Sequence, residues 1–192
     1  MSRPAKVLAP RHVRDLCRRA GRGRYALRNR LIVLLSFKAG LRACEIAGLE
    51  WGLVLTPSGR IAASIAVAGS IAKNGKGRRI PVHPELRAAL EKYHRASGCP
   101  GGGPVVRSQR GAHMTARSIV NWFAAIYDEL GYDGCSSHSG RRTFITNAAR
   151  LVSKTGGSLR DVQELAGHSA LSTTERYIEG DRDAQRKLVR LL

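Results

Sequence analysis

Residues 138–177, HSGRRTFITNAARLVSKTGGSLRDVQELAGHSALSTTERY, are the stretch from which the rest of the chain can be interpreted. His138 and Arg141 are three residues apart, so a helix would place them on one face. His168 and Tyr177 lie near the end of the stretch, nine residues apart. All four side chains can hold or attack a phosphate group, so this stretch predicts half of an active site.

The segment between these pairs predicts a helix that packs against a core. Phe144, Ala148, Leu151 and Val152 follow the i, i+4, i+7, i+8 spacing of a buried helix face. A further helix is expected to start within Ser172–Thr174, because hydroxyl side chains are good N-caps.

Working outward, the remaining sequence alternates between helical and extended patterns. Apolar periodicity and helix-start residues predict helices at Pro10–Ala20, Tyr25–Lys38 and Arg42–Gly48, from Pro84, from Thr115, from Ser158, and over Asp181–Leu192. Shorter β-rich runs bounded by turns predict three antiparallel strands at Trp51–Leu55, Ile61–Val67 and Arg78–Val82. We therefore expect a mainly α fold with a small antiparallel β-sheet (α+β). A basic tail at residues 1–9 would precede a single domain at residues 10–192.

The charge of the chain indicates its class of partner. It carries 33 Lys and Arg against 14 Asp and Glu, a formal net charge of +19. Such an excess favours a polyanion, and double-stranded DNA is the expected one, with an anionic membrane surface as the other option. No run of 18 apolar residues could span a bilayer, and no apolar signal segment opens the chain. The widely spaced Cys17, Cys44, Cys99 and Cys135 predict free thiols in a cytoplasmic protein rather than disulfides or a zinc site.

A second candidate for phosphate binding is Arg42, in GLRACEIAGL at residues 40–49. Glu45 lies one helical turn away and can hold the Arg42 side chain. A surface ion pair is the competing interpretation. The apolar neighbours of Arg42 favour a functional role, because a charge among them needs a compensating partner.

AKNGKGRRIP, residues 72–81, predicts a basic β-turn. Asn74-Gly75 is a strong hairpin signal. The glycines do not have the spacing of a nucleotide-binding P-loop, and Gly77 stands where that motif needs Ser or Thr. A turn of this charge can reach into a DNA groove, and a merely solvated hairpin is the alternative.

Arginine, histidine and tyrosine together suit phosphoryl transfer. Two arginines can bind the non-bridging oxygens of one phosphate and stabilise the charge of the transition state. A tyrosine hydroxyl beside such cations is a nucleophile, and a lysine or histidine can protonate the leaving oxygen. The sequence shows no acidic cluster for Mg²⁺, so we expect neither a metal nor another cofactor.

These motifs, taken in order, resemble the catalytic domain of the tyrosine recombinases, the phage integrase family, from about Leu8 to the end of the chain. AGLRACEIAGL is similar to the family's first arginine box, with Glu45 in support, and AKNGKGRRIP to its β2–β3 hairpin. HSGRRTFIT resembles the H-x-x-R box, and LAGHSALSTTERYI the segment that carries the nucleophile. Gly140 and Arg142 depart from the usual Leu and His. The resemblance implies that the catalytic residues are Arg42, Lys73 (with Lys76 as the competing choice), His138, Arg141, His168 and Tyr177.

The resemblance also implies an activity. Family members cut DNA by tyrosine attack, form a 3′-phosphotyrosine link without ATP, and rejoin strands while four protomers hold two DNA sites. We therefore expect a site-specific recombinase or integrase of prokaryotic or phage origin, acting as a homotetramer. The usual N-terminal DNA-clamping domain is expected to be absent. The alternatives are a type IB topoisomerase-like enzyme and a non-catalytic DNA-binding protein that retains the fold.

Overall fold

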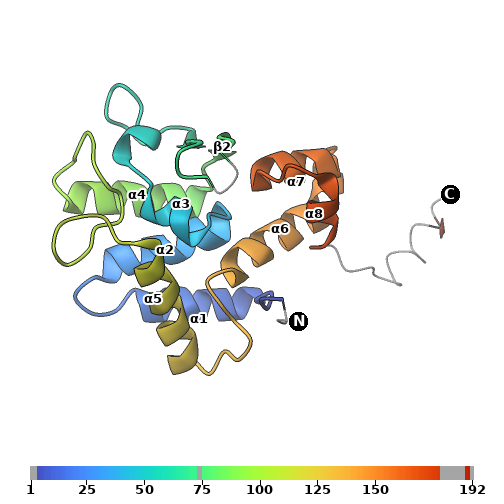
Figure 1. Ribbon diagram of the computed structural model, residues 1–192, viewed down its shortest axis with the longest axis horizontal. Helices are drawn as coiled ribbons and strands as arrows, with labels where there is room; N and C mark the ends of the chain where they lie inside the picture. The colour runs from blue at the N-terminus through green and yellow to red at the C-terminus, as the bar shows by residue number, and fades with distance from the viewer. Residues whose placement is uncertain (1–3, 73–74, 178–188, 191–192) are drawn as a thin grey trace.

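The computed structural model describes residues 4–72, 75–177 and 189–190. Helices form most of this part of the chain, and one hairpin interrupts them (Figure 1). The elements in chain order are α1 (Pro10–Ala20), α2 (Ala26–Lys38), α3 (Ala43–Ala47), the 3-10 turn η1 (Trp51–Leu53), β1 (Ser64–Val67), β2 (Arg78–Pro81), α4 (Pro84–Ala96), α5 (Ala116–Glu129), α6 (Ser139–Leu151), the 3-10 turn η2 (Val152–Thr155), α7 (Leu159–Ala166) and α8 (Leu171–Glu175).

Helix α2 is the centre of the main core. Its residues from Leu31 to Phe37 are all buried, and it packs against α1, α4 and α6. A helix that is apolar all round is stable only when other elements cover every side. The predicted helix at Tyr25–Lys38 is therefore confirmed, and it begins one residue later.

Helices α6, α7 and α8 form a smaller group at one side of the molecule (Figure 1). A separate apolar cluster holds this group together, with Ile145, Val162 and Ala166 at its centre. Helix α6 also packs on α2, so it joins the two cores. The predicted stripe on α6 is wrong at Leu151, a residue that is 53% exposed. The helix ends at this residue and the chain turns into η2, so Leu151 no longer follows the stripe.

The sheet has two strands in place of the three predicted. β1 and β2 pair antiparallel, with Ile65 opposite Ile80. Trp51–Leu55 does not form a strand, because η1 begins there. The Trp51 ring is buried, and its centroid lies 4.6 Å from the centroid of the His94 ring. Burial of this large side chain outweighs its β propensity.

One other prediction shifts at its boundary, and another falls mostly on residues that are not described. Helix α8 begins at Leu171, with Ala170 as its N-cap, so the predicted start within Ser172–Thr174 is wrong. The reason is that Thr174 is buried inside the helix and binds a side chain, as described below. The helix expected over Asp181–Leu192 lies almost wholly outside the described residues.

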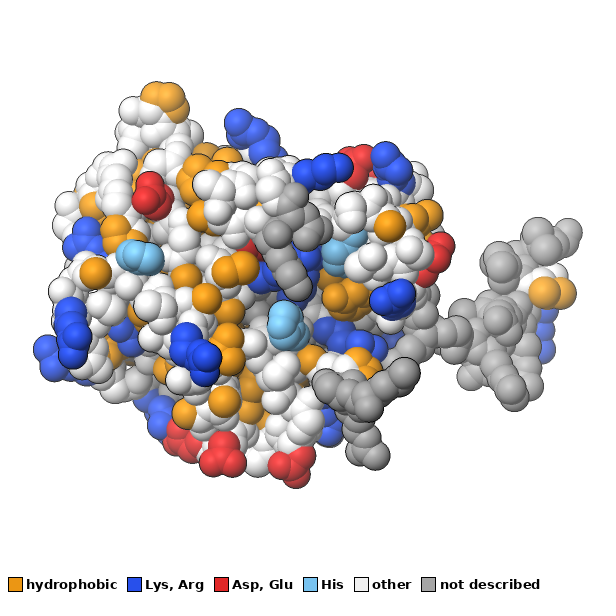
Figure 2. Space-filling view, viewed as in Figure 1, with side chains coloured by type: hydrophobic (Ala, Val, Ile, Leu, Met, Phe, Trp, Pro, Cys, Tyr) orange, Lys and Arg blue, Asp and Glu red, His pale blue; other side chains and the backbone are white. Residues whose placement is uncertain are grey.

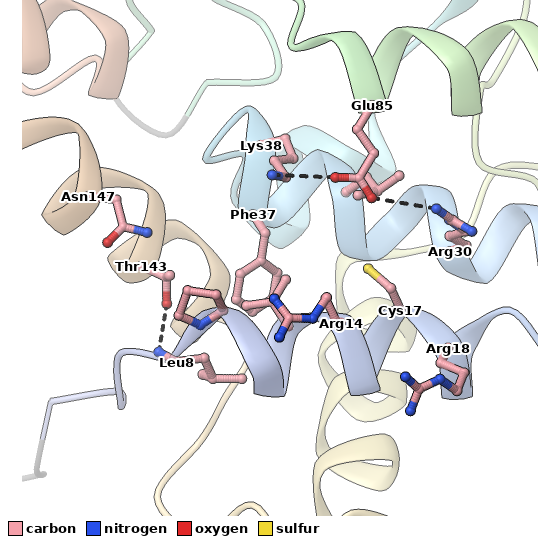
Figure 3. A pocket seen from close by; sticks show the side chains of 13 residues that line it. Leu8, Arg14, Cys17, Arg18, Arg30, Phe37, Lys38, Glu85, Thr143 and Asn147 are labelled. Atoms are coloured by element: carbon pink, nitrogen blue, oxygen red, sulfur yellow. Dashed lines mark hydrogen bonds and ion pairs between the residues drawn. The ribbon is translucent and has the colours of Figure 1, made fainter. Parts of the chain in front are cut away.

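The part of the basic tail that is described, from Pro4 onward, lies along the body. Lys6 N donates to Gly134 O, and Leu8 N donates to Thr143 Oγ1 on α6. A cavity of about 640 Å³ lies beside this segment, between α1, α2 and α6, and Figure 3 shows Glu85 at its rim bridging Lys38 and Arg30. None of the predicted catalytic residues lines it. In the described part of the chain, no helix has the length and apolar character needed to cross a membrane.

Candidate active site

Arg42 lies immediately before α3, and Glu45 one turn into it, as the sequence predicted. Arg42 Nη1 donates to Glu45 Oε1 (2.9 Å), and the backbone N–H of Arg42 donates to Glu45 Oε2 (2.9 Å). The Arg42 side chain is 15% exposed, whereas Glu45 is fully buried. The competing interpretation, a surface ion pair, is therefore excluded for this pair.

Arg78 on β2 is a member of the site that the sequence did not predict. Its guanidinium donates from Nη1 to Glu45 Oε1 (2.8 Å) and from Nη2 to Glu45 Oε2 (2.9 Å). Its side chain is only 6% exposed. The one signal in the sequence was a second arginine in the RRIP strand, which by itself does not tell which arginine points inward.

Glu45 is thus a buried carboxylate between two arginines. Burial by itself would raise the pKa of Glu45, but the hydrogen bonds and charges of Arg78 and Arg42 outweigh it and hold this pKa below its ordinary value. The carboxylate is therefore ionised near neutral pH and can keep both guanidinium groups in place.

Arg141, in the first turn of α6, is buried beneath the site. Nη1 donates to Gly40 O (2.7 Å), and Nη2 donates to Ala166 O at the end of α7 and to His168 Nε2 (3.1 Å). Gly40 has a φ of +62°, a left-handed conformation that favours glycine. Burial first, and then the charge of Arg42, lower the pKa of Arg141 to about 10, so the guanidinium still carries its charge at neutral pH.

His168 follows Gly167, the left-handed residue that ends α7. Because a guanidinium can only donate, Nε2 of His168 accepts from Arg141, and Nδ1–H then donates to Thr174 Oγ1 (2.9 Å). Burial first, and then the nearby arginine charges, lower the pKa of His168 to about 4. His168 is therefore neutral at neutral pH, and it orients Arg141.

Tyr177 comes just after α8, beside His168 and α6. The two rings stack with their centroids 5.5 Å apart, and Thr146 Oγ1 on α6 donates to Tyr177 O (3.1 Å). The guanidinium carbon of Arg142 lies 5.7 Å from the centre of the Tyr177 ring. In the sequence, Arg142 was noted only as a departure from the family pattern. The structure places its positive charge, in addition to that of Arg141, beside the predicted nucleophile Tyr177.

Two of the remaining predicted residues lie at the edge of this arrangement, and one cannot be placed. His138 is exposed at the N-cap of α6, and it lines a cavity of about 300 Å³ together with Arg141 and Tyr177. Lys73 lies outside the described residues. Lys76, the competing choice, is exposed and lines a cavity of about 670 Å³ that His168 also lines.

The structure therefore brings together residues from α3, β2, α6 and the turns around α8. Figure 2 shows Lys, Arg and His side chains gathered around a hollow near the middle of one face, while Asp and Glu lie mostly toward its rim. Among the residues that can be described, no three His, Cys, Asp or Glu side chains lie close enough to hold a metal ion. A group of arginines of this kind can bind a phosphate anion directly.

Comparison with known proteins agrees with this geometry. The family model described as the phage integrase family matches residues 6–183. Tyrosine recombinase XerC of Brucella suis is 33% identical over 157 residues, which cover 79% of this chain and 46% of the relative. Tyrosine recombinase XerC of Nitrobacter winogradskyi is 32% identical over 183 residues, covering 91% of this chain and 54% of the relative. The chain thus spans about half the length of these relatives.

Solved structures share the fold at lower sequence identity. The crystal structure of XerA recombinase matches with a TM-score of 0.76 and 21% identity, covering 98% of this chain and 65% of the other. A λ integrase dimer bound to a COC′ core site matches with a TM-score of 0.70 and 18% identity, covering 94% and 51%. The family match over most of the residues, together with these relatives and the arrangement of arginines, histidine and tyrosine, shows that the chain belongs to the phage integrase family.

Proposed function

We propose that this chain is the strand-cleaving domain of a site-specific DNA recombinase. The observation that carries the proposal is the convergence of Arg42 and Arg141 with His168 and the Tyr177 ring stacked on it. Relatives named tyrosine recombinase support the same activity. We assign this activity to residues 10–192, as one catalytic domain.

The proposed reaction exchanges one phosphodiester for another. The phenolic oxygen of Tyr177 forms a bond to phosphorus as the bond to the 5′ oxygen breaks. The phenolic proton of Tyr177 passes to water, and the departing 5′ oxygen gains a proton from Lys73 or, as the alternative, Lys76. Arg42 and Arg141 bind the non-bridging oxygens and stabilise the added charge of the transition state. Neutral His168 holds Arg141 in position through Nε2. His138, which is exposed, is the residue to which we assign a contact with the DNA backbone.

The proposed substrate is double-stranded DNA, and the proposed assembly is a homotetramer on two paired sites. The formal net charge of +19 supports a polyanionic partner. A solved λ integrase relative is a dimer on a core site, which supports assembly on DNA. The bacterial origin of the XerC relatives supports action in the cytoplasm of a prokaryote.

Replacement of Tyr177 by Phe tests the nucleophile. The phenylalanine ring can still stack on His168, so DNA binding should persist while covalent attachment is lost. The measurement uses nicked duplexes from the DNA that flanks the gene, in EDTA, with trapped protein–DNA adducts separated on a denaturing gel. EDTA should not matter, because arginines stabilise the charge in the proposed mechanism.

Each other result has a definite meaning. An adduct with Tyr177→Phe would show that another residue is the nucleophile. Relaxation of supercoiled DNA without joining of two sites would indicate a topoisomerase. Binding without any wild-type adduct would indicate a DNA-binding protein that retains the fold.

A further inference from the structure

Arg78 has a buried side chain that makes several hydrogen bonds with the candidate site. Besides its two hydrogen bonds to Glu45, its Nε donates to Leu165 O at 3.0 Å. Three donors of one planar group thus hold two elements, α3 and α7. Strand β2 itself packs against α7.

The contact with α7 is at a point where a helix needs partners. The last carbonyl oxygens of an α-helix receive no hydrogen bond from an N–H group of the same helix. Leaving such an oxygen buried without a donor costs free energy of folding. Arg78 donates to Leu165 O, and Arg141 donates to the next carbonyl, Ala166 O. Two arginines therefore cap the end of α7 directly before the turn that carries His168.

Gly167 makes this close packing possible. Its φ is +62°, and a Cβ at this position would lie 2.8 Å from Arg78 Cδ. The chain therefore turns tightly around the Arg78 side chain before it reaches His168.

The hydrogen bonds of Arg78 to Glu45 also influence the position of Arg42, because both arginines bind the same carboxylate. Arg78 binds both carboxylate oxygens, and Arg42 binds Oε1 through Nη1 alone. Among the residues that are described, Nε and Nη2 of Arg42 have no hydrogen-bond partner, so they are available to a phosphate. Without Arg78, the Glu45 carboxylate would have only Arg42 to balance its charge, and Arg42 would turn toward it.

We propose that Arg78 is a positioning residue of this site: it fixes Arg42 through Glu45, and it fixes His168 through the carboxyl end of α7. The proposal rests on the strand-cleaving function proposed above. We assign Arg78 no contact with the scissile phosphate, since three of its five N–H donors bind Glu45 and Leu165 and its side chain is only 6% exposed.

The test compares Arg78→Gln and Arg78→Lys with Arg79→Gln. Arg79 is the exposed neighbour on the same strand, so its replacement removes the same charge without the buried contacts. The measurement is the single-turnover rate of adduct formation at saturating nicked duplex, which separates cleavage from binding. A misplacement of about 1 Å can cost about 10² in rate, and we expect both Arg78 variants to lose about that factor relative to Arg79→Gln. Lysine keeps the charge but has a single nitrogen, without the planar fork that binds both Glu45 oxygens and Leu165 O.

A second measurement does not depend on activity. The His168 ring is followed by NMR through a pH titration of the DNA-free protein. Arg78→Gln should raise the pKa of His168, because it removes a nearby charge and loosens the turn, while Arg79→Gln should not. The double variant Glu45→Gln with Arg78→Gln removes one negative and one positive buried charge together, so the net charge of the site is unchanged, and it replaces Arg78→Gln if that protein does not fold.

The outcomes separate the two proposals. Arg78→Lys with the wild-type rate, or Arg78→Gln (or the double variant) that matches Arg79→Gln in both rate and His168 titration, would overturn the role of Arg78. If wild-type protein forms no adduct, the proposed function fails, and the His168 titration still decides whether Arg78 positions this turn.

Discussion

At the scale of single residues, the site is made of buried charges that are held by hydrogen bonds. Glu45 is fully buried between Arg42 and Arg78, and Arg141 is 3% exposed. Removal of one partner from such a group leaves an uncompensated buried charge, which costs far more than the loss of a surface ion pair. The same contacts that stabilise the fold therefore prearrange the cations for a phosphate.

His168 should make the stability of the protein depend on pH. Its pKa is about 4 in the folded state, against about 6.5 for an unfolded histidine. Folding thus favours the neutral ring. The stability that His168 contributes is therefore fully present above pH ~6.5, and it is lost as the pH falls toward ~4. The difference in free energy of unfolding between wild type and His168→Gln should shrink over this window, as measured by chemical denaturation at several pH values. A constant difference would contradict the buried neutral ring.

At the scale of elements, the packing of α6 on α2 decides where Arg141 lies. Gly140, which stands where the family usually has Leu, is buried against α2. A Cβ at Gly140 would overlap Ser36 Oγ and would lie 2.9 Å from Phe37 Cδ2. Glycine therefore allows the close approach of the two helices, and this departure from the family pattern is matched by the residues that face it.

Gly140→Ala should lower the free energy of unfolding, because the two helices must move apart. Overpacking of this kind costs about 1–3 kcal/mol. Chemical denaturation measures it, with Asn147→Ala on the exposed side of α6 as the control, for which we expect a change within about 0.5 kcal/mol. Ser36 Oγ is buried and has no partner among the described residues, so Ser36→Ala should recover part of the loss when combined with Gly140→Ala. Full stability of Gly140→Ala would show that the contact can relax.

At the scale of the whole molecule, the excess of positive charge should govern affinity for DNA. Each phosphate that a Lys or Arg neutralises contributes about −0.9 to the slope of log affinity against log salt. With several such contacts, affinity for duplex DNA should fall by about 10³ or more between about 50 and 200 mM salt. Fluorescence anisotropy on a target duplex and on an unrelated duplex measures both slopes. Affinity that hardly changes with salt would contradict a phosphate-dominated interface.

The sequence by itself was sufficient for the class of fold and for several of the residues that the structure brings together. Apolar periodicity and N-cap residues report local structure, and they predicted α1 to the residue and the Thr115 cap of α5. The motifs, each weak alone but specific when all occur in order, singled out Arg42, Glu45, Arg141 and His168, and the structure brings these four residues together.

Only the tertiary structure decided the contacts between distant segments. Arg78 lies 33 residues from Glu45 and 87 from Leu165, and no periodicity reports which side chains will meet over such separations. The same limit explains Trp51, which enters a turn so that its ring can pack on His94, and Leu151, which the end of α6 turns toward solvent. Local pattern predicts which face of an element is apolar, whereas the packing of elements against one another decides which side chain that face meets.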